Sequence, residues 1–204
     1  MIRKLLHMFS EHRFNRRMAR QRYKRGFSDN DCWGMNYWLV STFPDMILHL
    51  RDMKHGAPEL PFEEFDKLPW EWKDQELQKY KYIQEKNGYE YEPNSIFTKW
   101  YIILTRMAYC LKEADEDKEM YNPYKKDFDK AVWGDDLNTI KSFKDFRDKY
   151  FKKISGGYVL KTNEPDNDLK EKYFKFEDKN WLYREKMKNE AIDLLKKYFY
   201  NLWD

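Results

Sequence analysis

The chain has 204 residues, a length that suits one domain with a core large enough to need no disulfide or metal. Aromatic residues make up 19% and charged residues 37%, a mixture that excludes a disordered chain. The net charge is only +3, but residues 1–25 hold nine Lys or Arg and one acid, a net +8, which leaves −5 for the remainder. A basic arm therefore precedes an acidic body.

The basic arm is predicted to be a helix over residues 2–24 that ends at Gly26, because its apolar residues recur at helical spacing. Arginines and aromatic residues alternate along it, a pattern typical of a surface that neutralises phosphates and stacks on bases. The predicted nucleic-acid-binding residues are Arg13, Arg16, Arg17, Arg20, Arg22, Arg25, Phe14 and Tyr23. Two other interpretations stay open: a solvated helix docked on the acidic body, and a helix on an anionic membrane, which its short apolar face disfavours.

The segment 27–56 is predicted to be one long central helix. Ser28 is a good N-cap, and Asp31 three residues later completes a pattern like a capping box. Pro44 removes a backbone donor in the middle, so a kink is expected there, and Gly56 supplies a stop. Two apolar stripes run along the segment and predict burial on more than one side. Its polar residues argue against a membrane span.

Later helices follow from the same signals. A loop with three prolines leads to a helix over 70–86 that stops at Asn87 and Gly88, and Ser95 caps a strongly apolar helix that extends to Leu111. A weaker amphipathic helix is predicted after Asp135, and it ends at residues 155–157. Residues 158–160 have the pattern of a short strand, but a run of three residues cannot form a sheet by itself. The last helix starts at Pro165 and Asp166 and carries apolar residues to the end of the chain.

Together these patterns predict an all-α fold. We expect an irregular helical bundle of a single domain, built around the long Pro-kinked helix, with at most a minor strand pair. The expected division is a basic helical arm over 1–26 and a helical domain over 27–204, in which 60–165 is a candidate for a variable insertion.

Cys32 and Cys110 lie in apolar helical patterns without CxxC spacing, so both are predicted to be reduced core thiols of a cytoplasmic protein. The one candidate metal site consists of Asp45, His49 and Asp52, which share a helical face at i, i+4 and i+7. This spacing differs from the Glu-x-x-His pair of di-iron bundles, and the same residues are equally typical of a solvated face. We predict no cofactor and no catalytic residue.

Three separated pieces of the sequence resemble a family of small proteins of tailed bacteriophages and related bacterial genomes, for which no activity is known. The first is RGFSDNDCW at residues 25–33, followed by Tyr37, Trp38 and Leu39; the second is HGAP at 55–58; the third is KYFYNLWD at 197–204. The resemblance covers the two ends and not the region of about 60–165. It implies a phage origin and carries no site residue to this chain.

For function, the patterns favour a non-enzymatic phage protein that binds nucleic acid through its basic arm in the host cytoplasm or in the virion. The alternative is a protein-protein interaction factor, either a virion assembly component or an inhibitor of a host defence protein. Its surface would be an aromatic patch formed by Trp70, Trp72, Tyr80 and Tyr82. A membrane partner is not predicted.

Overall fold

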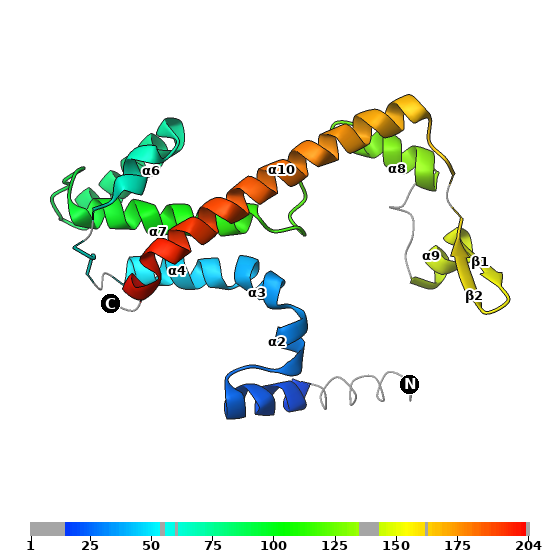
Figure 1. The fold of residues 1–204 in the computed structure, drawn as a ribbon, viewed down its shortest axis with the longest axis horizontal. Helices are drawn as coiled ribbons and strands as arrows, with labels where there is room; N and C mark the ends of the chain where they lie inside the picture. Colours follow the sequence, from blue (N-terminus) through cyan, green and yellow to red (C-terminus); the bar gives the residue numbers. More distant parts are fainter. Residues whose placement is uncertain (1–14, 54–55, 60, 135–142, 162, 203–204) are drawn as a thin grey trace. The chain divides into compact units, whose positions relative to one another are not determined.

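The computed structural model describes residues 15–53, 56–59, 61–134, 143–161 and 163–202 (Figure 1). The chain forms two compact units. Unit 1 contains Met1–Asp115 and Lys186–Asp204, and unit 2 contains Glu116–Glu185. The predicted mainly α-helical fold with a minor strand pair is confirmed. The predicted arm boundary at residue 26 and the predicted insertion stay predictions.

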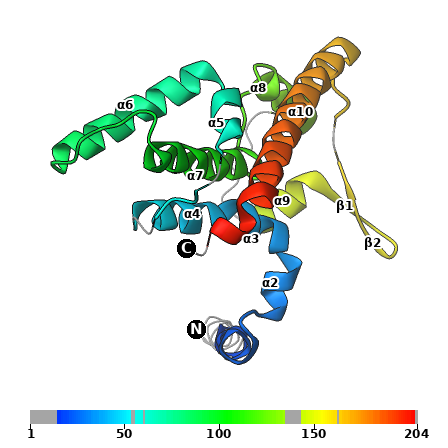
Figure 2. The same ribbon diagram turned by 60° about the vertical axis from the view of Figure 1, so that its left-hand side comes forward.

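All the secondary structure described in unit 1 is helical. The N-terminal helix is described over residues 15–25 and is followed by short helices that lead to the longer α6 and α7. The elements of unit 1 are α2 (Asp29–Trp33), α3 (Met35–Ser41), α4 (Phe43–Asp52), α5 (Glu63–Lys67), α6 (Trp70–Lys86) and α7 (Ile96–Glu113) (Figures 1 and 2). They are followed by the part of α10 (Asn167–Tyr198) from Lys186 onward and by the 3₁₀ helix η2 (Phe199–Asn201).

The core of unit 1 is built around α7. Most of this helix is buried, and Ile102, Ile103 and Met107 have no exposed surface. Helices α3, α4, α5 and α6 all pack against α7. From α10, Tyr198 is fully buried and its ring lies 5.3 Å from that of Trp100. The predicted Ser95 cap is confirmed, since its Oγ accepts a hydrogen bond from the Thr98 amide.

The segment predicted as one long buried helix is instead three short helices, α2, α3 and α4. The helical run is interrupted at Gly34 (φ −108, ψ 30) and again at Thr42, two residues before Pro44, although the Thr42 backbone itself stays in the right-handed helical region (φ −102, ψ −44). The second break fits the kink predicted for Pro44, which offers no N–H to the carbonyl four residues earlier. The first break was missed.

The predicted burial of this segment is also wrong. Helix α3 has no buried residue, and α4 buries only Pro44 and Ile47. Tyr37 and Trp38 are 56% and 42% exposed. The two apolar stripes therefore do not both face the core, and α7 takes the central position.

The two cysteines differ in environment. Cys110 lies in the α7 core with no exposed surface, and burial raises the pKa of its thiol to about 12. Cys32 in α2 is exposed, so its predicted place in the core is wrong. Cys32 is exposed because, within the described part of the chain, no other element packs over its apolar stripe at α2.

Unit 2 combines short helices with a hairpin. Its elements are α8 (Lys125–Trp133), α9 (Phe143–Tyr150), β1 (Phe151–Ile154), β2 (Gly157–Leu160) and the first part of α10. Strands β1 and β2 pair antiparallel, from Phe151 opposite Leu160 to Ile154 opposite Gly157. Gly156 at φ 96 makes the turn, which favours glycine. The helix predicted to close at 155–157 thus ends at Tyr150, and its first residues lie outside the described ones.

Aromatic rings hold unit 2 together. The rings of Phe128 in α8 and Tyr173 in α10 stack with centroids 3.9 Å apart. Asn122 is buried and donates from Nδ2 to the Glu177 carboxylate at 2.6 Å. Trp133 meets Tyr150 edge to face at 5.4 Å. These contacts join α8 to the first part of α10 and to α9.

Among the described residues, no helix combines the length and the apolar character that crossing a membrane requires.

Candidate nucleic-acid interface

The N-terminal helix leads directly into α2 through a tight reversal. The helix ends at Gly26, whose φ of 82 favours glycine, and the Gly26 amide donates to the Arg22 carbonyl at 2.8 Å. Two residues later, the buried Ser28 caps α2. Its Oγ accepts from the Asp31 amide while the Asp31 carboxylate accepts from the Ser28 amide, so the predicted capping box is confirmed. The reversal brings Asp29 and Asp31 against the preceding helix.

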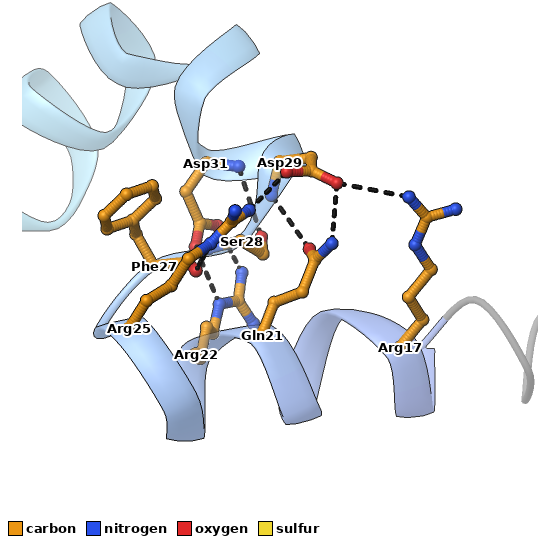
Figure 3. A network of polar contacts seen from close by, with 8 residues as sticks. All are labelled: Arg17, Gln21, Arg22, Arg25, Phe27, Ser28, Asp29 and Asp31. Atoms are coloured by element: carbon orange, nitrogen blue, oxygen red, sulfur yellow. Dashed lines mark hydrogen bonds and ion pairs between the residues drawn. The ribbon is translucent and has the colours of Figure 1, made fainter.

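Asp29 is the acceptor for one side of the N-terminal helix (Figure 3). Arg17 donates to its Oδ2 at 3.2 Å, Gln21 donates to the same oxygen at 2.6 Å, and Arg25 donates to Oδ1. The Gln21 side chain also accepts from the Asp29 amide at 3.0 Å. One carboxylate at the start of α2 thus holds three side chains spaced by four residues, which share a helical face.

Asp31 has a single arginine partner in a two-point contact. Arg22 donates from Nε to Oδ2 at 2.9 Å and from Nη2 to Oδ1 at 2.5 Å (Figure 3). This fork geometry is the strongest form of an arginine-carboxylate pair. Arg25 adds a further link, since its Nε donates to the Phe27 carbonyl at 3.0 Å and its guanidinium lies 4.8 Å from the Phe27 ring centroid.

Both carboxylates are held in their charged form. Hydrogen bonds from Arg22 and then from the Ser28 amide lower the pKa of Asp31 well below its usual range. Hydrogen bonds from Arg25 and Gln21 lower the pKa of Asp29 in the same direction. The same contact raises the pKa of Arg22. Near neutral pH this set is therefore a network of charged hydrogen bonds, which we call the Asp29–Asp31 clamp.

A second set of side chains forms a neighbouring stripe of the N-terminal helix, about 100° around its axis from Arg17, Gln21 and Arg25. Arg16, Arg20 and Lys24 follow one another at i, i+4 and i+8, and Tyr23 lies beside them. All four are exposed, and Tyr23 is exposed to 92%. Within the described part of the chain, the three cations have no ion-pair or hydrogen-bond partner. We call this set the open face.

The structure thus sorts the predicted nucleic-acid-binding residues into three groups. Arg16, Arg20 and Tyr23 lie on the open face, whereas Arg17, Arg22 and Arg25 are engaged in the clamp. Arg13 and Phe14 lie outside the described residues.

Two features of this region were missed by the sequence prediction. Lys24 belongs to the open face, and Asp29 and Asp31 are internal partners of the arginines as well as members of the α2 cap. The signal for the second feature was present, because two acids follow the last arginines after a glycine turn. The prediction treated these two acids only as residues of the α2 N-cap and did not consider them as partners of the arginines.

The candidate metal residues are not gathered into a ligand set. The Asp45 carboxylate pairs with Lys112 of α7 at 2.7 Å, and Asp52 pairs with Arg51 at 2.8 Å. His49 is exposed on α4. Among the residues the structure describes, no group of three His, Cys, Asp or Glu side chains is placed to hold a metal ion.

The predicted aromatic patch on α6 is divided between surface and packing. Trp70 and Tyr82 are 69% and 66% exposed. Trp72 lies against Arg106, whose guanidinium is 4.9 Å from its ring centroid, and Tyr80 stacks on Tyr101 at 4.0 Å. Only two of the four rings are therefore open to a partner.

Comparison with protein-family models, with curated proteins and with solved structures found no match for this chain.

Proposed function

We propose that this protein is a non-enzymatic, phage-encoded helical protein that binds nucleic acid through the open face of its N-terminal helix. The observation that supports the proposal is the division of the arm's cations: three are paired with the two carboxylates of the Asp29–Asp31 clamp, and Arg16, Arg20 and Lys24 are exposed without partners in the described structure. The clamp fixes the helix, and the open face supplies the charge.

The spacing of the open face suits a phosphate backbone. Residues four apart lie about 6 Å from each other along a helix axis, so three cations in one row can each meet a separate phosphate. Contacts of this kind release counterions and read no sequence, which makes affinity fall steeply as salt rises. Tyr23, which is 92% exposed, is available to stack on an unpaired base.

The clamp arginines are poorer candidates for phosphate contacts. A phosphate reaching Arg22 would have to replace both oxygens of Asp31, and one reaching Arg25 would have to replace Asp29. These carboxylates stay charged at neutral pH and compete with any anion. Direct binding is therefore assigned to Arg16, Arg20, Lys24 and Tyr23.

The test is a fluorescence anisotropy titration with labelled, mixed-sequence single-stranded DNA and RNA between 50 and 200 mM salt. The triple variant Arg16→Gln/Arg20→Gln/Lys24→Gln should bind more weakly at 50 mM salt. The slope of log affinity against log salt should become shallower by roughly 2, because each lost contact to a single strand removes about 0.7. Glutamine keeps a helix propensity close to that of arginine and lysine, so the helix should remain.

A matched control removes the same charge elsewhere. Lys126, Lys175 and Lys196 are exposed lysines outside the N-terminal helix, and their joint change to glutamine should leave the salt slope unaltered. An equal loss in this control would assign binding to net charge alone. Absence of binding by the unaltered protein at 50 mM salt would reject the proposal.

The second candidate function, a protein-protein interaction factor, is favoured by the exposure of Trp70 and Tyr82 on α6. Such a partner should be retained at 500 mM salt, where phosphate contacts fail. Affinity capture at that salt with the unaltered protein and with Trp70→Gln/Tyr82→Gln separates the two functions. A partner lost only from the variant supports the interaction surface, and identical capture by both proteins rejects it.

A further inference from the structure

Unit 1 contains a cavity of about 820 Å³ that the nucleic-acid proposal does not use. It is formed by the end of α4, the second half of α6, the connector that follows α6 and the first half of α7, with Asn201 of η2 at one side. Its volume lies in the range of sites for small organic molecules. The walls include Leu50, Arg51, Tyr80, Tyr89, Phe97 and Tyr101.

The walls are rich in aromatic rings, two of which are exposed to solvent. Tyr89 and Phe97 are exposed to 54% and 58%, whereas Trp100 is buried at the base. Tyr80 and Tyr101 stack at 4.0 Å, and burial raises the pKa of both phenols, so these rings are uncharged at neutral pH. Ring faces carry negative potential and attract cations.

The cavity already holds one cation of the chain itself. The Arg51 guanidinium lies 4.5 Å from the Tyr101 ring centroid and donates from Nη1 to Thr105 Oγ1 at 3.0 Å. It is neutralised by Asp52, which accepts from Nε at 2.8 Å and from Nη2 at 3.1 Å. In this wall, the face of the Tyr101 ring and the Asp52 carboxylate together stabilise a cation.

Among the described residues that line the cavity, the remaining charge is negative. The lining contains four ionisable carboxylate or guanidinium groups, and the Arg51–Asp52 pair cancels two of them. Glu90 and Glu92 remain, and within the described part of the chain their carboxylates have no hydrogen-bond or ion-pair partner. A phosphate or a carboxylate ligand would meet this charge unfavourably, and a purely apolar ligand would leave it unused.

We propose that this cavity binds an organic cation, an alkylated ammonium group attached to an apolar body. The ammonium would sit against the Phe97 and Tyr89 rings near Glu90 and Glu92, and the apolar part would extend toward Leu50 and Leu104. None of residues 15–25, the described part of the N-terminal helix, lines the cavity, so this inference is independent of the proposed nucleic-acid binding.

The test compares three probes of nearly the same shape: choline, its neutral carbon isostere 3,3-dimethyl-1-butanol, and the anion 3,3-dimethylbutyrate. Ligand-observed NMR titration of the full chain gives the three affinities. Choline should bind about tenfold more tightly than the neutral isostere, and the anion should bind most weakly. Equal affinity for choline and its isostere, or no binding of choline, overturns the proposal.

Two variants locate the binding. Glu90→Gln/Glu92→Gln should bring the affinity for choline close to that for the neutral isostere, and Phe97→Leu should weaken choline several-fold by removing an exposed ring face. The matched control is Glu59→Gln/Glu71→Gln, which removes two exposed carboxylates outside the cavity. If the control lowers choline affinity as much as the cavity variant, the site is overturned in favour of unspecific attraction to an acidic surface.

Discussion

Individual carboxylates at the start of α2 each have several partners: Asp29 accepts from three side chains of the preceding helix, and Asp31 accepts from Arg22 and from the Ser28 amide. Asp31 caps the Ser28 amide and binds Arg22, and Asp29 joins Arg17 and Arg25 to the same turn. These groups are largely exposed, so each pair contributes little energy alone and is weakened by salt. Their effect is to set the position of the N-terminal helix, while Arg16 and Arg20 stay outside this set of ion pairs.

A pH titration tests the clamp at this scale. Carbon-detected NMR should show Asp29 and Asp31 titrating below the ordinary aspartate value of about 3.9. Because their pKa values are depressed in the folded protein, the stabilisation they provide is complete above that ordinary value. It is lost as the pH falls through the folded pKa values. Arg22→Gln should return the midpoint of Asp31 toward 3.9.

Arg16→Gln serves as the control, since Arg16 lies on the open face and should leave both midpoints unchanged. A normal Asp31 midpoint in the unaltered protein would show that the clamp does not form in solution.

Between elements, α7 and α10 are joined by a buried ion pair. Arg106 is only 4% exposed at its side chain and forms a two-point pair with Glu190, at 2.6 Å from Nε and 2.8 Å from Nη2. Its guanidinium also lies over the rings of Trp72 and Tyr109, so helices α6, α7 and α10 share one cation. The sequence-based prediction did not include this pair, because 84 residues separate the partners.

Loss of one partner from this pair should be costly. Glu190→Ala leaves a buried guanidinium without its counter-charge and should lower the free energy of unfolding by about 3 kcal/mol. The double variant Arg106→Met/Glu190→Leu should lose less, because it removes both charges and keeps apolar volume. Urea unfolding followed by far-ultraviolet circular dichroism measures both. A smaller loss for Glu190→Ala than for the double variant would contradict the role of the pair.

At the scale of the whole molecule, each unit has a core of its own. Unit 1 buries the middle of α7, and unit 2 relies on stacked rings such as Phe128 and Tyr173. Helix α10 contributes residues to both units. Proteins open locally in cooperative units, and the free energy of opening differs from one unit to another.

Hydrogen exchange should separate the two cores. Phe128→Ala removes a stacked ring and should raise exchange within 116–134 and 143–161, while the amides of 102–111 keep their protection. Met107→Ala should lower the free energy of unfolding by about 2–5 kcal/mol and raise exchange in α7. A uniform rise along the chain in both variants would show that the two units unfold as one.

The positions of most helices were predictable because their signals are local. The caps at Ser28 and Ser95, the stops at Gly26 and Gly88, and three- to four-residue apolar spacing all act within one or two turns. The location of the candidate interface was predictable for the same reason, since charge concentration is a property of the sequence. The hairpin was harder to predict. A strand at β2 requires β1 as its partner, and the β1 residues were predicted to belong to the preceding helix.

Burial and pairing required the fold. Tyr37 and Ile103 both belong to apolar helical stripes, yet Tyr37 is 56% exposed and Ile103 is fully buried. Arg16 and Arg17 are adjacent in the sequence, yet only Arg17 reaches Asp29. Periodicity identifies which residues share a face, but the neighbour opposite that face comes from elsewhere in the chain. The sequence alone was therefore sufficient to predict a basic arm followed by helices. Which apolar stripe is buried depends on the packing around α7, and which arginine is paired depends on the turn at Ser28.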